Sequence, residues 1–110
     1  MSVTERRKGA AGELEVVRIL RATWWPRAER TSRGTAQAGR GDIANGPAGC
    51  HLEIKRQERL NVPKALDQIE ADRNSPQDIP LLVHRPSRHG WMATLPLEDL
   101  LPLLALRERG

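Results

Sequence analysis

The sequence predicts a single α/β domain over residues 1–110, with a mixed central β-sheet flanked by helices. The length of 110 residues suits one domain with one hydrophobic core. Apolar residues recur every three or four positions in two segments, as on the buried face of a helix. Short apolar runs of strand length lie between and after them. The expected order is therefore helix, strand, two hairpin strands, helix, two strands, helix.

The first helix is expected from about Thr4 to Arg21, and the tryptophans and proline of residues 24–26 close it. The tryptophans are expected in the core or at a subunit contact. Glu13 falls on the apolar face, where a carboxylate is rarely left unpaired. It either reaches a functional site or lies at the partly exposed edge of the apolar stripe. The stripe consists of Gly9, Ala10, Glu13, Val16, Val17 and Leu20.

Residues 28–32 are a plausible short strand, and residues 33–40 that follow form a predicted basic loop. The loop contains glycines, small residues and two arginines, Arg33 and Arg40, but no apolar anchor. A loop of this composition beside a functional site is well placed to contact phosphates. The alternative is a solvated connector, and the two interpretations are compatible.

The stretch from Gly41 to Lys55 is expected to form a hairpin around which the rest of the chain is organised. A turn-rich segment, residues 45–49, separates two short strands. Side chains alternate along a strand, so Leu52 and Ile54 are expected to face the core.

The opposite face of the same hairpin carries the candidate chemistry. Glu53 and Lys55 share that face, and the paired strand can bring Asp42 beside them. Placing two carboxylates and an ammonium on one face of a sheet costs folding free energy, so a function is expected for them. Two carboxylates suit a hard cation such as Mg²⁺. A lysine beside them can deprotonate a water or stabilise charge on a phosphate. Only three of the 18 basic residues are lysines, which makes a random surface choice at position 55 less plausible.

A second helix is expected to begin near Val62 or Pro63, with Asn61 as its N-cap. Gln68 lies at the edge of its apolar stripe, either bordering the predicted site or as an ordinary surface glutamine. The stripe consists of Val62, Ala65, Leu66 and Ile69.

Two strands are expected over residues 80–85 and 91–95, followed by a C-terminal helix. Pro96 suits the start of this helix, and Pro102 is expected to break or kink it. The leucines of the tail exceed what one face of a small domain can bury. A subunit interface is the expected explanation.

The net charge of +4 favours a polyanionic partner, although ordinary solvation is an equally good explanation of charge alone. A single cysteine, Cys50, excludes an internal disulfide and favours a reducing compartment. No apolar run has membrane-spanning length, and no signal-peptide segment precedes the first helix. The absence of tyrosine and phenylalanine argues against base-stacking surfaces of the RNA-recognition type.

The pair Gly41-Asp42 and the element Glu53-Ile54-Lys55 resemble the signature of the PD-(D/E)xK nucleases. From Lys8 to about Leu104 the layout is similar to the archaeal-type Holliday junction resolvases, which viruses also carry. Gly41 stands where the motif is named for proline. The resemblance implies a restriction-endonuclease-like core and a metal-dependent, structure-selective DNA endonuclease. It would resolve four-way junctions by symmetric paired nicks that leave 5′-phosphates.

The resemblance also implies roles for individual residues. Asp42 and Glu53 would bind Mg²⁺, or Mn²⁺ in its place, while Glu13 completes or supports the metal site. Lys55 would activate the water or stabilise the phosphate. Gln68 would position the water, and Ser32 would lie near the scissile phosphate. The basic residues expected to bind DNA are Arg6, Arg7, Lys8, Arg30, Arg33, Arg40, Arg56, Arg85 and Arg88.

The expected assembly is a homodimer with two active sites, since a junction needs two symmetric cuts. Neither a nucleotide cofactor nor a membrane partner is expected. The expected location is the cytoplasm of a prokaryotic cell, or of the host if the protein is viral. The alternatives are another PD-(D/E)xK nicking or repair nuclease, a non-catalytic DNA-binding domain with a nuclease-like fold, and a generic basic interaction domain.

Overall fold

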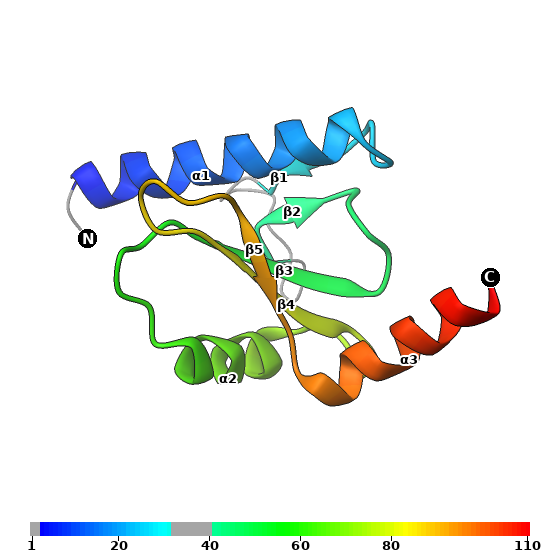
Figure 1. Cartoon of the computed structure of the whole chain (residues 1–110). Helices are drawn as coiled ribbons and strands as arrows, with labels where there is room; N and C mark the ends of the chain where they lie inside the picture. Colours follow the sequence, from blue (N-terminus) through cyan, green and yellow to red (C-terminus); the bar gives the residue numbers. More distant parts are fainter. Residues whose placement is uncertain (1–2, 32–40) are drawn as a thin grey trace.

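The computed structural model describes residues 3–31 and 41–110, and within the first helix its side chains from residue 9 onward (Figure 1). The elements in these ranges follow the expected order, and the prediction of one domain that mixes helices and strands is confirmed. They are α1 (Val3–Ala22), β1 (Glu29–Arg30), β2 (Ile43–Ala44), β3 (Cys50–Lys55), α2 (Val62–Asp72), β4 (Ile79–His84), β5 (Met92–Thr94) and α3 (Leu97–Arg109).

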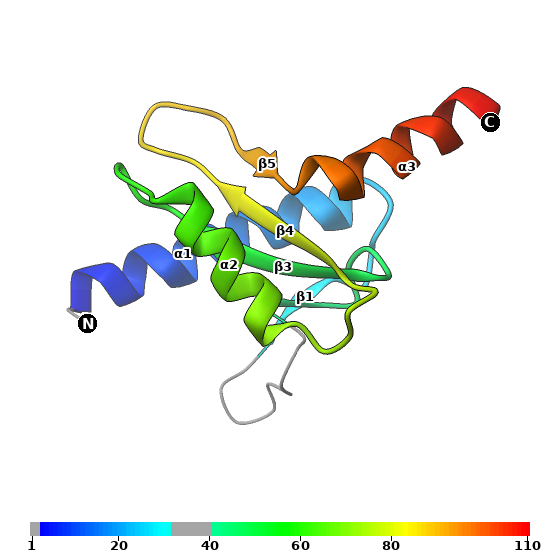
Figure 2. The same ribbon diagram turned by 90° about the horizontal axis from the view of Figure 1, so that it is seen from below.

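The largest sheet has the strand order β3-β4-β5 and is mixed, because β3 and β4 are parallel while β4 and β5 are antiparallel. Helix α1 lies over one face of this sheet and α2 over the other (Figures 1 and 2). Alternation along β3 divides its side chains between the two faces. Leu52 and Ile54 pack in the α1 layer, whereas Glu53 and Lys55 face α2.

The main core lies between α1 and the sheet. The helical stripe predicted from the sequence is confirmed, since Val16, Val17 and Leu20 are all buried there. A buried aliphatic side chain of this size contributes roughly 1.5–3 kcal/mol. Gly12 permits the close approach of α1, because a Cβ at this position would lie 3.3 Å from the ring of Trp91. The residues buried against the helix are Ala28, Ile43, Leu52 and Ile54.

Helix α2 begins as predicted. The Oδ1 atom of Asn61 accepts a hydrogen bond from the backbone N–H of Lys64 at 3.1 Å, and proline occupies the first turn. On the sheet side of the helix, Ile69 is buried, as is Leu82 of β4. This second, smaller apolar layer fixes α2 against the face of the sheet that carries Glu53.

The predicted hairpin between the strands on either side of residues 45–49 is wrong. Strand β2 pairs with β1 in antiparallel fashion, and the bridge to β3 in the described residues is parallel and joins Leu52 to Gly41, which precedes β2. A two-residue hairpin turn of type I′ needs two adjacent left-handed residues. Here the left-handed positions, Asn45 (φ 58°) and Gly49 (φ 73°), are not adjacent, so the connection is a wider loop. Within residues 3–31 and 41–110, the strands are consequently divided between a two-stranded and a three-stranded sheet.

Helix α3 confirms the helix predicted for the tail, and it continues through Pro102 without the predicted break. It extends away from the body of the domain (Figure 2). The helix lies wholly within the described part of the chain, and none of its residues is buried. The two tryptophans after α1 differ in burial. Trp25 packs on the core while Trp24 is 79% exposed, so a core position for Trp24 is wrong. Among the described residues, no helix combines the length and the apolar character needed to cross a membrane.

Candidate functional site

Asp42 lies beside β3 even though no hairpin forms. Its backbone N–H donates to the carbonyl of Leu52 at 2.9 Å, and its Oδ2 accepts from the N–H of Ile54 at 2.7 Å. The carbonyl of Asp42 accepts a third bond, from the N–H of Thr31 at 3.1 Å. Side chain and backbone together therefore fix this carboxylate next to the strand that carries Glu53 and Lys55.

Gly41 makes the close approach of Asp42 to β3 possible. Its φ is +70°, and a Cβ there would collide with the carbonyl oxygen of Leu52 and lie 3.0 Å from the His51 ring. Proline holds φ near about −65°, so it cannot adopt this conformation. Glycine at this position, where the resembling motif has proline, is therefore required by the local backbone geometry.

Glu53 has the most perturbed carboxyl group of the site. Burial, the charge of Asp42 and a hydrogen bond with the Asp42 side chain raise its pKa to about 7, against a smaller lowering effect of His51. The Nε2 atom of His51 is hydrogen-bonded to Oε1 of Glu53 at 3.1 Å, and His51 is only 2% exposed. Sequence reasoning missed His51. The signal was its position two residues before Glu53 on the same face of the strand.

Glu13 reaches the same group of charges from α1. Burial raises the pKa of its carboxyl, and the charge of Asp42 raises it further, whereas Arg30 and Lys55 lower it. The Oε2 atom of Glu13 lies 3.5 Å from Nη2 of Arg30. Glu13 is partly buried, so both expectations for it have support: it lies at the edge of the apolar stripe and within electrostatic range of the predicted site. Arg30, an expected DNA contact, is its ion-pair partner.

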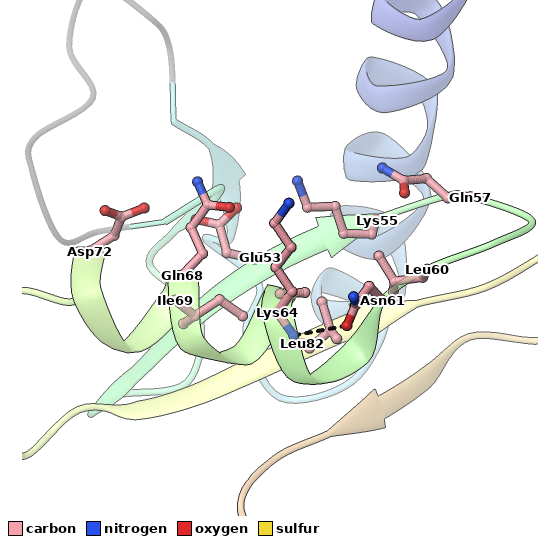
Figure 3. Close-up of a pocket in the computed structure, with 11 residues that line it drawn as sticks. Glu53, Lys55, Gln57, Leu60, Asn61, Lys64, Gln68, Ile69, Asp72 and Leu82 are labelled. Carbon is pink, nitrogen blue, oxygen red and sulfur yellow. Dashed lines mark hydrogen bonds between the residues drawn. The ribbon is translucent and has the colours of Figure 1, made fainter.

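A pocket of about 230 Å³ opens between β3 and α2, on the face of the sheet opposite α1 (Figure 3). Glu53 and Lys55 line it from the strand, and Gln68 lines it from the helix. The structure thus brings Gln68 to the predicted site rather than leaving it on an unrelated surface. The remaining lining residues are Gln57, Leu60, Asn61, Lys64, Ala65, Ile69, Asp72 and Leu82.

The donor set at this site fits a hard cation in part. The charge of Asp42 raises the pKa of the Glu53 carboxyl, and a divalent ion can stabilise two such neighbouring carboxylates in their charged form. Within the part of the chain that is described, no three His, Cys, Asp or Glu side chains converge closely enough to hold a metal ion. Asp42 and Glu53 are therefore the pair that could hold Mg²⁺, with Glu13 nearby.

Arg56 and Arg85, which were expected to contact DNA, do not line the pocket. Both form ion pairs with Glu15 of α1, at 3.7 Å and 3.3 Å respectively. The Arg85 guanidinium also stacks on Trp91, 5.6 Å from the ring centroid. Their Nε atoms are buried with no hydrogen-bond partner among the described residues. The structure thus gathers these two arginines around Glu15, and Arg88 remains exposed in the adjacent loop.

Several predicted site residues lie outside the described residues. They are Ser32, Arg33 and Arg40, together with the side chains of Arg6, Arg7 and Lys8.

Comparison of the chain with protein-family models, with curated proteins and with solved structures gives no match. The described site therefore consists of Glu13, Asp42, Glu53, Lys55 and Gln68, in and around one pocket.

Proposed function

We propose that this protein is a metal-dependent DNA endonuclease with a restriction-endonuclease-like core, and that it resolves four-way junctions by paired nicks. One observation carries the nuclease assignment. Asp42 is held beside β3 by its bond from the N–H of Ile54, burial and then the charge of Asp42 raise the pKa of Glu53 to about 7, and Lys55 follows on the same strand face. The choice of a junction as substrate rests on the sequence resemblance and on the leucine-rich surface of α3.

The proposed metal site consists of Asp42 and Glu53, with Glu13 as a third acidic group at its edge. A bound Mg²⁺ would supply a water of lowered pKa and neutralise charge on the phosphate. Asp42 is suited to a fixed position, because one carboxylate oxygen already accepts a bond from Ile54. His51 orients the Glu53 carboxylate through its bond at 3.1 Å.

Lys55 and Gln68 would act on the other reactants. The ammonium group of Lys55 can donate hydrogen bonds to a phosphate oxygen and stabilise the charge that develops there. Gln68 lines the same pocket from α2 and can hold a water molecule through its amide group. In this assignment, Lys55 on β3 stabilises the phosphate, and Gln68 on α2, across the pocket, positions the water.

A non-catalytic DNA-binding domain is the rival from a different functional class. Carboxylates gathered beside the pocket would repel phosphate and weaken such binding unless a cation neutralised them. A nicking or repair nuclease of the same superfamily would share the site but would not need paired cuts. The two rivals separate experimentally, because only the first predicts no cleavage of any DNA.

The decisive experiment is cleavage of an immobile four-way junction, beside the matching linear duplex and single strand, with and without Mg²⁺. We expect Mg²⁺-dependent paired nicks in opposing strands of the junction. The Asp42→Asn variant serves as the control for contaminating nucleases. Equal cutting of linear duplex would overturn the junction assignment. No cleavage of any substrate by well-folded protein that binds DNA would favour the non-catalytic rival.

A further inference from the structure

Lys64 faces the same pocket as Lys55, from the opposite wall. It lies on α2 four residues before Gln68, and residues at this spacing share one side of a helix. Both Lys64 and Gln68 line the pocket across from β3. Figure 3 shows the Lys55 side chain leaving β3 and the Lys64 side chain leaving α2, on the two sides of the pocket. Lys64 had no role in the sequence-based predictions.

The use of lysine in this chain marks Lys64 independently of the geometry. Only three of the 18 basic residues are lysines, at positions 8, 55 and 64. Two of these three line the one pocket that also holds Glu53. An ammonium is a compact charge on a flexible stem, whereas the planar guanidinium of arginine is larger and binds best in a forked geometry. Lys64 is exposed where it lines the pocket, so its flexible stem can bring the ammonium to an anion there.

The charges around Lys64 favour an anion on its side of the pocket. The first turn of α2 contains no acidic residue, and its N-cap is the neutral Asn61, so no negative charge there offsets the positive N-terminal end of the helix dipole. The acidic residues that line the pocket are Glu53 and Asp72. Glu53 lies on β3, and Asp72 lies at the C-terminal end of α2. If a cation neutralises Glu53 and Asp42, Lys55 on one wall and Lys64 on the other leave the pocket positively charged.

We propose that Lys64 binds the backbone phosphate next to the one that is cleaved, so that the pocket holds two consecutive phosphates of one strand. Lys55 and the carboxylate pair serve the scissile phosphate. Lys64 fixes the register of the strand from the opposite wall. The proposal rests on the proposed nuclease function, but binding to DNA can be measured without cleavage. Lys64 is therefore a DNA-binding residue with no part in the bond-breaking step.

The first test compares Lys64→Gln with Lys64→Arg and with Arg18→Gln, a matched loss of charge at an exposed position of α1. Junction binding is measured over a range of salt concentrations in the Asp42→Asn background, which does not cut. We expect Lys64→Gln to weaken binding about three- to tenfold. We also expect it to lower the log–log salt slope by about 0.9, the value of one phosphate contact. Lys64→Arg should keep the slope, and Arg18→Gln should change affinity less than Lys64→Gln.

The second test locates the phosphate by replacing single phosphates of the cleaved strand with neutral methylphosphonates. Neutralising the flanking phosphate should weaken DNA binding by protein that keeps Lys64. The same change should have little effect on the affinity of the Lys64→Gln variant, which has already lost this contact. In the cutting protein, Lys64→Gln should raise KM and leave kcat within about twofold, as for an interaction made equally in ground and transition states.

Three results would overturn the proposal: an unchanged salt slope in Lys64→Gln, coupling to a different phosphate, or a fall in kcat without a change in KM. Protein that binds DNA but never cuts would refute the nuclease function. In that case, an unchanged salt slope and the absence of coupling to any methylphosphonate position would also refute Lys64 as a phosphate contact. Circular dichroism melting of each variant checks that the exposed substitutions leave the fold intact.

Discussion

The side chain of Asp42 is tied to β3 by a 2.7 Å hydrogen bond from the backbone N–H of Ile54 to Oδ2. Ile54 lies between Glu53 and Lys55, so this bond sets the Asp42 carboxylate level with both side chains. An asparagine at position 42 can still accept the same bond through its amide oxygen. Substituting this residue by asparagine therefore removes a charge and preserves the local geometry.

The first prediction concerns this charged group. Asp42→Asn, Glu53→Gln and Lys55→Ala should each lower the cleavage rate at least about 100-fold, because each removes a group from the reacting centre. Affinity for DNA should be unchanged or higher in the two carboxylate variants, since phosphate repulsion is reduced. Cleavage and gel-shift assays on the same preparations measure both. A wild-type rate in any one of the three variants would place the active site elsewhere.

The second prediction follows from the raised pKa of Glu53, about 7 in the folded chain against an ordinary value of 4.5. The folded state holds this proton at a pH at which the unfolded state has released it. The free energy of unfolding should therefore fall as pH rises from about 4.5 to about 7, and then level off. Glu53→Gln should be more stable than wild type at pH 8, by up to about 3 kcal/mol, and of equal stability near pH 4.

Denaturant unfolding in EDTA at both pH values measures the effect of Glu53→Gln. Adding Mg²⁺ at pH 8 should stabilise wild type more than the variant, because only wild type keeps both carboxylates. A variant that is less stable than wild type at pH 8 would contradict the raised pKa of Glu53.

The third prediction is the choice of metal. Mg²⁺ or Mn²⁺ should support cleavage, and Ca²⁺ should permit binding without turnover, because the donors are hard carboxylate oxygens. Cleavage of the junction is measured after removal of metal and addition of each ion in turn. Full activity in excess EDTA would remove the metal from the mechanism.

The fourth prediction concerns α3, whose leucines are exposed, with Leu97 at 66% and Leu101 at 53%. A second copy of this helix covering them would give a dimer of about twice the 12.3 kDa chain mass by light scattering. Leu101→Asp should give monomers that nick but do not make paired cuts. Glu108→Gln, on the same helix, is the matched control. A wild-type monomer, both free and on the junction, would contradict the paired-nick assignment.

The fifth prediction separates stability from DNA binding at Arg85. This residue pairs with Glu15 at 3.3 Å and stacks on Trp91, with its side chain 21% exposed. Arg85→Ala should lower the free energy of unfolding by about 1–2 kcal/mol. The exposed neighbour Arg88→Ala should leave stability unchanged. Urea unfolding of both variants, and of Glu15→Gln combined with each, measures the coupling. No loss of stability in Arg85→Ala would leave a phosphate contact as its main role.

What could be predicted from the sequence was local. Periodicity located α1 and its buried face, and Asn61 fixed the start of α2, because both signals depend on neighbours within a few residues. The partner of β2 could not be predicted, because the wide loop after Ala44 sends that strand to β1. The position of Lys64 depends on how α2 lies across the sheet, which no local pattern determines. From the residues alone, Glu13 was foreseeable as a carboxylate on an apolar face, and its link to the site came from the family resemblance.

Gly41 has a genetic consequence. Its backbone conformation admits no other residue without strain, although glycine supplies no chemical group. A random screen for inactive clones should therefore return changes at codon 41 as well as at the codons for the carboxylates. Such alleles would keep every reactive side chain. Their phenotype would nevertheless be the same as that of alleles in which a reactive residue is replaced. A clone of this kind would be inactive because the carboxylate at position 42 is displaced from its neighbour on β3.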